Sequence, residues 1–496
     1  MRAFTRLLLP TTTTLTRTTR VVSLFRPSSR FYSMATPYKV HISPQNTGLW
    51  AVPQTEEAAK KASLLLQEDL EKHHTFFNEE GFHNHIPHHI LALFGTGADA
   101  SSLQKGYDGN AHYQRPALPP HPEVIQELRD WDHAREYLGN EKYYPDFLRF
   151  FQKEMETQSW EDVVLKYLFK AERDDATDDM LVRLYSGFLH PLIQLMCGME
   201  WSQPAIVAEA LAQVAVHGND IKPLLLESEK LANEQDGNYA MPDLVELYDA
   251  VKRDEKLANA PKMSDPNKLR AVLARAKDEM VAVAGRVKVR PEELEKRTAE
   301  MFNAAVYVAS SAALAQYPQK HPKFDFFLMH HVNSSPIFVT INRADWIPEE
   351  TKVRLLEWKI RMDLAQYAAR AVPELSIDKI SNYQPKKLEK LEDKMKDLKV
   401  KDAKPTDVIS RLHEFEDDGH AIKLGRAAGV AYHISKKYED DESVKLMIKG
   451  EETWTRVFHL IVDSVEAPGP NWVRSCGFAE AWKEVPDMKQ DVDGKL

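Results

Sequence analysis

Histidines gather in one short stretch of this sequence, GFHNHIPHHILALFGTGADA, which spans residues 81–100. Four of them, His83, His85, His88 and His89, fall within seven residues and are followed by a glycine-rich turn. Neutral imidazole is a good ligand for iron, zinc or copper, so the stretch points to a metal. Neighbours on one short turn cannot all point at the same ion, and at most one or two are expected to face inward. The rest of a site must come from other segments.

Three further histidine segments lie far along the chain, and each is apolar. His190 sits in SGFLHPLIQLMCGMEW, His330 and His331 in FDFFLMHHVNSSPIF, and His420 in EDDGHAIKLGRA. A metal site in a helical protein forms when each facing helix contributes one inward ligand. A single buried histidine is more often a hydrogen-bonded core residue, and this alternative stays open for each position.

The tetrapeptide HAIK places Lys423 three residues after His420, so on a helix the two side chains share a face. An ammonium group cannot bind a metal. The lysine would have to be deprotonated, or converted by carbon dioxide to a carbamate, and burial favours both changes by lowering the pKa of the amine. The alternative is an ion pair with Asp417 or Asp418.

The glycines of residues 95–100 match the dinucleotide fingerprint G-x-G-x-x-G/A. That fingerprint needs a strand before it, a helix after it and an acidic residue about 20 positions on. The preceding IPHHILALF is better described as a helix, and no acidic residue stands at the ribose position. Gly95 or Gly97 is therefore predicted to end a helix.

The elements that must position these side chains are predicted to be helices. Helical spacing of apolar residues recurs over 55–77, 122–139, 143–169, 202–218, 241–257, 265–285 and 290–317, and most of these segments begin with a capping residue or proline. Alternation typical of a strand is nearly absent, and residues 336–342 are its best candidate. We expect an all-α fold: one large multi-helix domain over residues 40–496 with a histidine-lined core pocket, interrupted by a lysine-rich charged excursion at 382–405.

Composition excludes several classes of protein. The 496 residues carry a net charge of -10, which argues against nucleic-acid binding. No apolar run reaches the ~18 residues of a spanning helix, so no membrane span is expected. The two cysteines, Cys197 and Cys476, cannot build a disulfide framework or a multi-thiolate metal site.

The first residues of the chain differ from all that follow, because they are rich in arginine and threonine and the first acidic residue is Glu56. This composition is typical of a mitochondrial transit peptide. Residues 1–35 are therefore predicted to be a disordered transit-like segment that directs the protein to the mitochondrial matrix. Translation from Met34 would instead give a cytoplasmic form.

Taken together, the segments resemble the questin oxidase-like family of fungal polyketide pathways. The matching stretches are GFHNHIPHHILALFGTGA, YLGNEKYYPDFLRFFQKEM, GFLHPLIQL, FDFFLMHHVNSSPIF, DGHAIKLGRA and WVRSCGFAEAW, which extend from about residue 80 to 482. The resemblance implies an oxidoreductase that opens anthraquinone rings, formally by Baeyer–Villiger oxidation. Some members are similar to non-haem iron dioxygenases whose metal is held by four histidines and a carboxylated lysine. Others work without a tightly bound cofactor, and NADPH is associated with the family as a co-substrate.

Carried over by motif, the iron ligands would be His85, His190, His330, His420 and Lys423, with His88 or His89 as alternatives to His85 and His331 as the alternative to His330. The leading hypothesis is an enzyme, a monooxygenase or dioxygenase, that uses dioxygen to cleave or oxygenate a small aromatic or quinone-like substrate. Without a metal, a histidine would deprotonate a phenol or enol, and the resulting carbanion would react with dioxygen. The alternative is a non-catalytic helical mitochondrial binding or scaffold protein with structural histidines.

Overall fold

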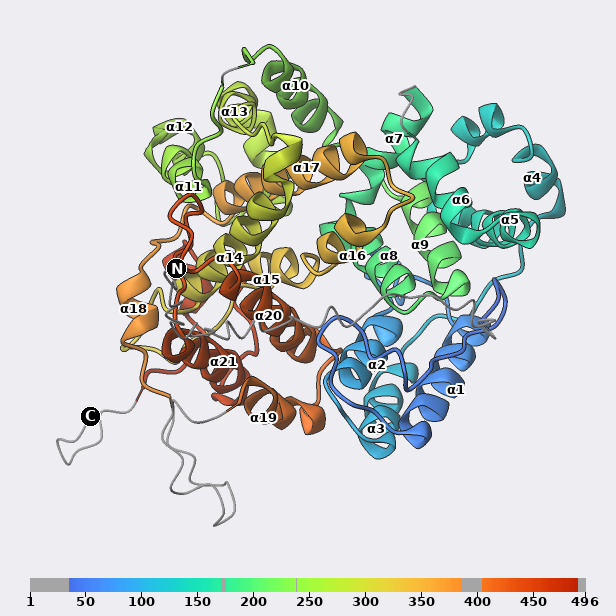
Figure 1. Cartoon of the computed structure of the whole chain (residues 1–496), viewed down its shortest axis with the longest axis horizontal. Coiled ribbons are helices and arrows are strands. Elements are labelled where there is room, and N and C mark those ends of the chain that lie inside the picture. The colour runs from blue at the N-terminus through green and yellow to red at the C-terminus, as the bar shows by residue number, and fades with distance from the viewer. Residues whose placement is uncertain (1–34, 171–174, 238, 386–403, 489–496) are drawn as a thin grey trace, which may run out of the picture. The chain divides into compact units, whose positions relative to one another are not determined.

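The computed structural model describes residues 35–170, 175–237, 239–385 and 404–488 (Figure 1). Over these ranges the regular structure is helical, with isolated bridges and no β-strand. The all-α prediction is confirmed. The predicted transit-like segment, apart from Ala35, and the middle of the charged excursion, residues 386–403, lie outside the described residues.

The first half of the chain forms helices α1 to α12. Their bounds are α1 Glu56–Lys72, α2 Ile86–Gly95, α3 Ala100–Ala111, α4 Pro122–Glu127, α5 Tyr144–Thr157, α6 Trp160–Val164, α7 Asp175–Leu184, α8 His190–Glu200, α9 Pro204–Val216, α10 Lys222–Asn233, α11 Leu244–Arg253 and α12 Glu255–Asn259. A π-helical turn, Leu165–Phe169, follows α6, and a short 3₁₀ turn, Gly187–Leu189, precedes α8.

The second half forms helices α13 to α21. Their bounds are α13 Lys268–Ala284, α14 Leu294–Ala313, α15 Phe326–Asn333, α16 Ile337–Arg343, α17 Glu349–Ala369, α18 Ile377–Ser381, α19 Pro405–Ile409, α20 His420–Lys436 and α21 Glu451–Glu466. Further 3₁₀ turns are Trp131–Glu136, Glu141–Tyr143, Pro291–Glu293, Ser410–Glu414 and Ala479–Trp482.

Local sequence signals explain many of the boundaries. The side chain of Thr55 accepts a hydrogen bond from the backbone N–H of Ala58 at the start of α1, and Asp99 does the same for Ser102 at the start of α3. Helix α2 ends at Gly95, and Gly97 follows with a left-handed φ of +92°. The prediction that these glycines end a helix is confirmed, and the strand that a nucleotide fingerprint requires is absent before them.

Two segments differ from the predicted elements. Residues 336–342, the candidate strand, are largely the helix α16, whose residues Ile337, Phe338, Val339 and Ile341 are all buried. In a short, mostly apolar run the spacing of buried residues does not distinguish a helix from a strand. The single helix expected over 122–139 ends at Glu127, and Asp130 then caps a separate 3₁₀ turn.

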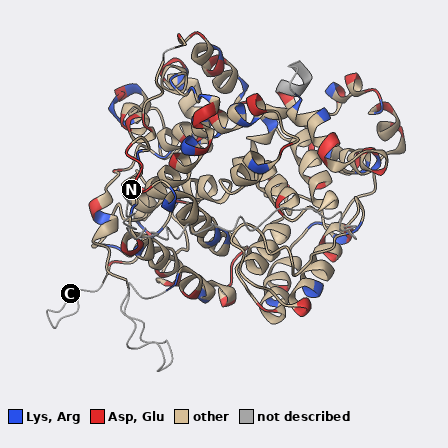
Figure 2. Ribbon diagram, viewed as in Figure 1, with Lys and Arg blue, Asp and Glu red and all other residues tan. Residues whose placement is uncertain are grey.

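Helix α2 contacts both α8 and α20, and α15 contacts α20, so the segments that carry the histidines meet inside one apolar core (Figure 1). Figure 2 shows lysines and arginines mixed with acidic residues along the helices of the described part of the chain. Among the described residues, no helix is long and apolar enough to cross a membrane.

Candidate metal centre

Three helices present a histidine at their first turn to a common point. His85 is the N-cap of α2, His190 is the first residue of α8, and His420 is the first residue of α20. His330 reaches the same region from α15. All four side chains are buried, with exposed fractions of 5% or less. Their Nε2 atoms therefore meet in an environment from which water is largely excluded.

Glycines allow the backbone turns that lead into two of these helices. Gly419, just before His420, has a left-handed φ of +85°, and a Cβ there would lie 2.6 Å from the Cβ of His89. Gly187, three residues before His190, has a φ of +55°, and a Cβ there would lie 2.3 Å from Nε2 of His217. Both positions need glycine for conformation and for space.

The ring nitrogens lie close together in two pairs. Nε2 of His85 is 2.8 Å from Nε2 of His190, and Nε2 of His420 is 3.1 Å from Nε2 of His330. The potential ligand atoms of His85, His190 and His420 all lie within 4.8 Å of one another, and this is the one such group of three found in the described part of the chain.

The other nitrogen of each ring faces a fixed acceptor. Nδ1 of His190 is 2.7 Å from the carbonyl oxygen of Gly187, and Nδ1 of His330 is 2.5 Å from that of Phe326. The carboxylate of Asp418 accepts from Nδ1 of both remaining rings, His420 through Oδ1 and His85 through Oδ2, the latter at 3.0 Å. Because each Nδ1 carries the proton, each neutral ring presents an unprotonated Nε2 to the centre.

Electrostatics keep these rings neutral. Burial and the nearby Lys423 lower the pKa of His85 to about 3, and burial lowers the pKa of His190 and His330 well below the ordinary value. Burial alone would raise the pKa of Asp418, but its two imidazole partners hold it well below the ordinary carboxyl range. Asp418 is therefore an anion placed behind two neutral imidazoles.

This donor set fits a metal ion. Unprotonated nitrogens 2.8 and 3.1 Å apart repel each other unless a cation lies between them, because neither can donate a hydrogen bond. Two nitrogen ligands about 2.1 Å from one ion, and at right angles to each other, lie about 3 Å apart. The carboxylate and carbonyl acceptors on Nδ1 are the partners usually found behind metal-binding histidines.

Lys423 lies one turn after His420 on α20 and is buried. Its Nζ has no hydrogen-bond partner, although Asp417 and Asp418 are near in sequence. Asp418 is held by the histidines, and Asp417 accepts from the backbone N–H groups of Gly419 and Ala421. The ion pair considered from the sequence does not form. A small cavity beside Lys423 is also lined by His88 and Asn333, which carry the unpartnered atoms Nδ1 and Oδ1.

The side chains of His88, His89 and His331 point away from the cluster and bind other partners. His88 bonds Gln194 through Nε2 at 2.6 Å, and His89 lies near Asn110 on the other side of α2. His331 places Nδ1 2.5 Å from Asp363, whose carboxylate also accepts from the buried Lys359. The structure thus brings His85 and His330 to the cluster, and not the alternatives His88, His89 and His331.

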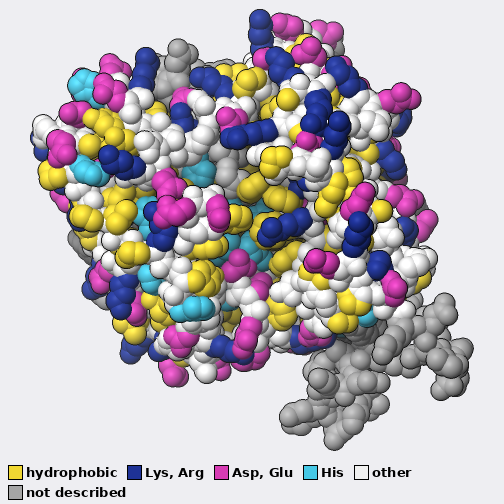
Figure 3. Space-filling view, turned by 180° about the vertical axis from the view of Figure 1, so that it is seen from behind, with side chains coloured by type: hydrophobic (Ala, Val, Ile, Leu, Met, Phe, Trp, Pro, Cys, Tyr) yellow, Lys and Arg dark blue, Asp and Glu magenta, His cyan; other side chains and the backbone are white. Residues whose placement is uncertain are grey.

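A cavity of 560 Å³ opens onto two of the clustered rings, His85 and His190. His83 and His217 line it too, and their Nε2 atoms are 2.8 Å apart. In Figure 3, histidine side chains reach the surface near the middle of the face, bordered by hydrophobic and acidic side chains. The prediction of a histidine-lined pocket in the helical core is confirmed.

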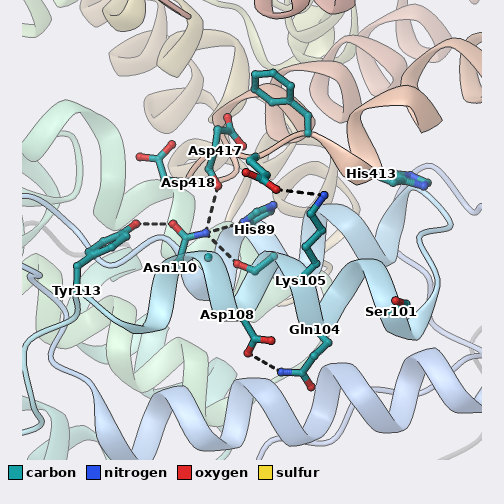
Figure 4. Close-up of a pocket in the computed structure, with 14 residues that line it drawn as sticks. His89, Ser101, Gln104, Lys105, Asp108, Asn110, Tyr113, His413, Asp417 and Asp418 are labelled. Carbon is teal, nitrogen blue, oxygen red and sulfur yellow. Dashed lines mark hydrogen bonds and ion pairs between the residues drawn. The ribbon is translucent and has the colours of Figure 1, made fainter. Parts of the chain in front are cut away.

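A second cavity of 660 Å³ lies on the outer side of Asp418. Figure 4 shows His89, Asn110 and Tyr113 on one wall and Asp417 and Asp418 above them. The side chain of Asp418 is 33% exposed there, so solvent reaches the carboxylate that holds two of the rings. This cavity therefore contacts Asp418, which holds two of the rings, rather than the Nε2 atoms of the cluster.

Sequence reasoning missed three contributors: Asp418 as the acceptor for two rings, the carbonyl of Gly187, and the pair His83 and His217. Asp418 precedes His420 by two residues at a helix start, and a carboxylate so close to a candidate ligand could have been recognised as its partner. The pair has no such signal, because its members are 134 residues apart.

Comparison with known proteins finds the sequence model of one family, described as Questin oxidase-like, matching residues 82–428. The chain is 34% identical to Oxidoreductase AflY of Aspergillus parasiticus, over 92% of this chain and 95% of that one. It is also 34% identical to Questin oxidase of Aspergillus fumigatus, over 91% and 100%, and 31% identical to Baeyer-Villiger oxidase ptaJ of Pestalotiopsis fici, over 92% and 99%.

Proposed function

Because the chain belongs to the questin oxidase-like family and is an oxidoreductase, we propose that it uses dioxygen for Baeyer–Villiger-type or dioxygenase cleavage of an aromatic, quinone-like substrate. A non-haem iron ion would be held by His85, His190, His330, His420 and Lys423 and would supply the chemistry with dioxygen. The relatives' names, Questin oxidase and Baeyer-Villiger oxidase, support this class of reaction.

One observation carries the proposal: four buried imidazoles turn unprotonated Nε2 atoms toward each other, and each Nδ1 is held by an acceptor. When bound, iron supplies the one-electron chemistry by which dioxygen reacts with an organic substrate. The chain supplies the rest of the site, which consists of four neutral imidazoles, the side chain of Lys423, a buried setting and one supporting carboxylate.

Lys423 enters the site as a carbamate. Burial lowers the pKa of its amine, and a neutral amine attacks carbon dioxide, forming a C–N bond and releasing one proton. The product offers an anionic oxygen instead of an ammonium, which removes a positive charge from beside His85 and His420. The unpartnered Nζ of Lys423 in a buried setting supports this modification.

Helix dipoles, rather than a further cationic side chain, stabilise an anionic substrate oxygen. The starts of α2, α8 and α20 point at the centre, and the positive ends of their helix dipoles favour negative charge there. Phe82, Phe188 and Phe326 line the 560 Å³ cavity, which lies in the size range of small-molecule sites. A flat phenol or quinone is therefore held by aromatic faces, with its oxygen near His85 and His190.

NADPH use follows from the electron balance. If one oxygen atom enters the substrate and the other leaves as water, two electrons are needed, and NADPH supplies them. If both atoms enter the substrate, no nicotinamide is consumed. Oxygen uptake measured together with NADPH oxidation distinguishes the two forms of the reaction.

Metal analysis of the purified full chain tests the proposal. We expect about one iron per chain after anaerobic reconstitution, and loss of most of it in His190→Ala, His330→Ala and His420→Ala, because each removes a ligand. The matched control is His459→Ala, which removes another buried histidine whose ring nitrogens have no partner. Full activity without iron would refute the metal and favour a histidine acting as base.

We also propose that residues 1–35 direct the protein to the mitochondrial matrix, on the composition of this segment. A fluorescent protein fused after residue 35 should enter mitochondria, and a chain begun at Met34 should stay in the cytoplasm. Equal distributions of the two fusions would contradict this localisation.

A further inference from the structure

The turn that leads into α8 has an unusual backbone. Gly187, Phe188 and Leu189 have successive left-handed φ values of +55°, +54° and +66°. Such a conformation is costly for a side chain with a Cβ, and it persists where the surrounding contacts require it. Ser186 holds the turn by donating its hydroxyl to the carbonyl of Gly218 at 2.7 Å.

The turn places an apolar ring beside the histidine cluster. Phe188 is 41% exposed, and it is two residues from His190. Its ring contacts that of Phe327, with centroids 4.8 Å apart, and Phe327 in turn packs against the guanidinium of Arg370. Phe188 therefore has support on one side and an open face on the other.

The same residue lines two neighbouring cavities. The 560 Å³ cavity at the cluster and a neighbouring cavity of 260 Å³ share four lining residues, Gly187, Phe188, His217 and Gly218. Phe188 is the only large apolar side chain among them. Beyond it, the smaller cavity is lined by Tyr185, Leu189, Met362 and other residues.

The lining of the first cavity carries few charges. Its carboxylates are those of Glu80 and Glu141, and Glu141 is paired with Arg115 at 2.8 Å. Aromatic side chains at the same walls favour a flat apolar ligand.

We propose that Phe188 is a specificity-determining residue: its ring bounds the substrate cavity on the side of the neighbouring cavity, so that the enzyme takes a fused-ring aromatic that fills the first cavity and stops at this ring. This rests on the proposed function, since it names the substrate class of the same site. Removing the ring joins the two cavities and admits longer fused-ring molecules.

Binding to the iron-replete full chain tests this, with one hydroxylated quinone of three fused rings and one of four as probes. For the unmodified protein we expect the four-ring probe to bind about tenfold more weakly, or worse, because the cavity ends at Phe188. In Phe188→Ala and in Phe188→Gly this ratio should fall to about one. Leu64→Ala, which removes an exposed apolar side chain outside both cavities, should keep the original ratio.

Comparing the two Phe188 variants separates loss of the ring from a change in the backbone, since glycine relieves the strain of the left-handed conformation and alanine does not. An unchanged ratio in both, or an equal change in Leu64→Ala, would overturn the proposal. Normal size selection with no oxygen uptake on any probe would leave Phe188 in its role and refute the proposed reaction instead.

Discussion

Replacing Asp418 with asparagine changes a single atom behind two metal-binding histidines. Its carboxylate accepts from Nδ1 of His420 through one oxygen and from Nδ1 of His85 through the other, the latter at 3.0 Å. In Asp418→Asn, one of the two oxygens becomes an NH₂ group, which donates. The ring that faces it must then accept through Nδ1, so its proton moves to Nε2 and that nitrogen can no longer bind a metal.

The variant therefore weakens one ligand without creating a cavity. Loss of a carboxylate behind a metal-binding histidine typically weakens metal affinity by about 10- to 100-fold, or about 1.4 to 2.8 kcal/mol. Competition for iron against a chelator of known affinity measures this, and thermal unfolding monitored by circular dichroism shows that the fold is kept. Oxygen uptake should fall in proportion to iron occupancy.

Asp108→Asn is the matched control, because Asp108 lines the same outer cavity and its carboxylate contacts Gln104 rather than a histidine (Figure 4). It removes one negative charge from the same cavity and should keep the iron affinity of the unmodified protein. If Asp418→Asn holds iron as tightly as the control, the assignment of proton positions on His85 and His420 is wrong.

The other predictions concern the support of the cluster and its protonation. Gly187→Ala should lower the free energy of unfolding by more than about 1 kcal/mol, since it combines a left-handed φ of +55° with a Cβ 2.3 Å from Nε2 of His217. If the variant and the unmodified protein unfold at the same denaturant concentration, the close contact is contradicted. Histidines whose pKa is lowered by burial, such as His85 to about 3 and His89 to about 4, stay neutral in the folded chain while the unfolded chain takes up protons below about pH 6.5. The apo protein should therefore lose up to about 1.4 kcal/mol per pH unit and per such histidine as the pH falls from 6.5 toward 4, and show no such change above 6.5. Urea unfolding at several pH values checks this, and a flat profile between pH 6.5 and 5 would refute the buried neutral state.

Much of the helical fold was predictable because its signals are local. The cap at Thr55, the proline at the start of α4 and the glycines after α2 each act within one turn of chain. Residues 336–342, the best candidate for a strand, are mostly helical, since a short run rich in β-branched and aromatic residues does not distinguish a helix from a strand. Its helical state is set by the helices packed around it.

The sequence shows which residue types are available to the centre and indicates that helices carry them. It placed His85, His190, His330, His420 and Lys423 in apolar segments. The tertiary fold sets which rings meet, because their convergence depends on packing between α2, α8, α15 and α20. It also decided where the protons lie, since Asp418, Gly187 and Phe326 reach Nδ1 through contacts that fix each ring in one orientation. Spacing along the chain carries no record of such contacts, because segments up to 333 residues apart form them.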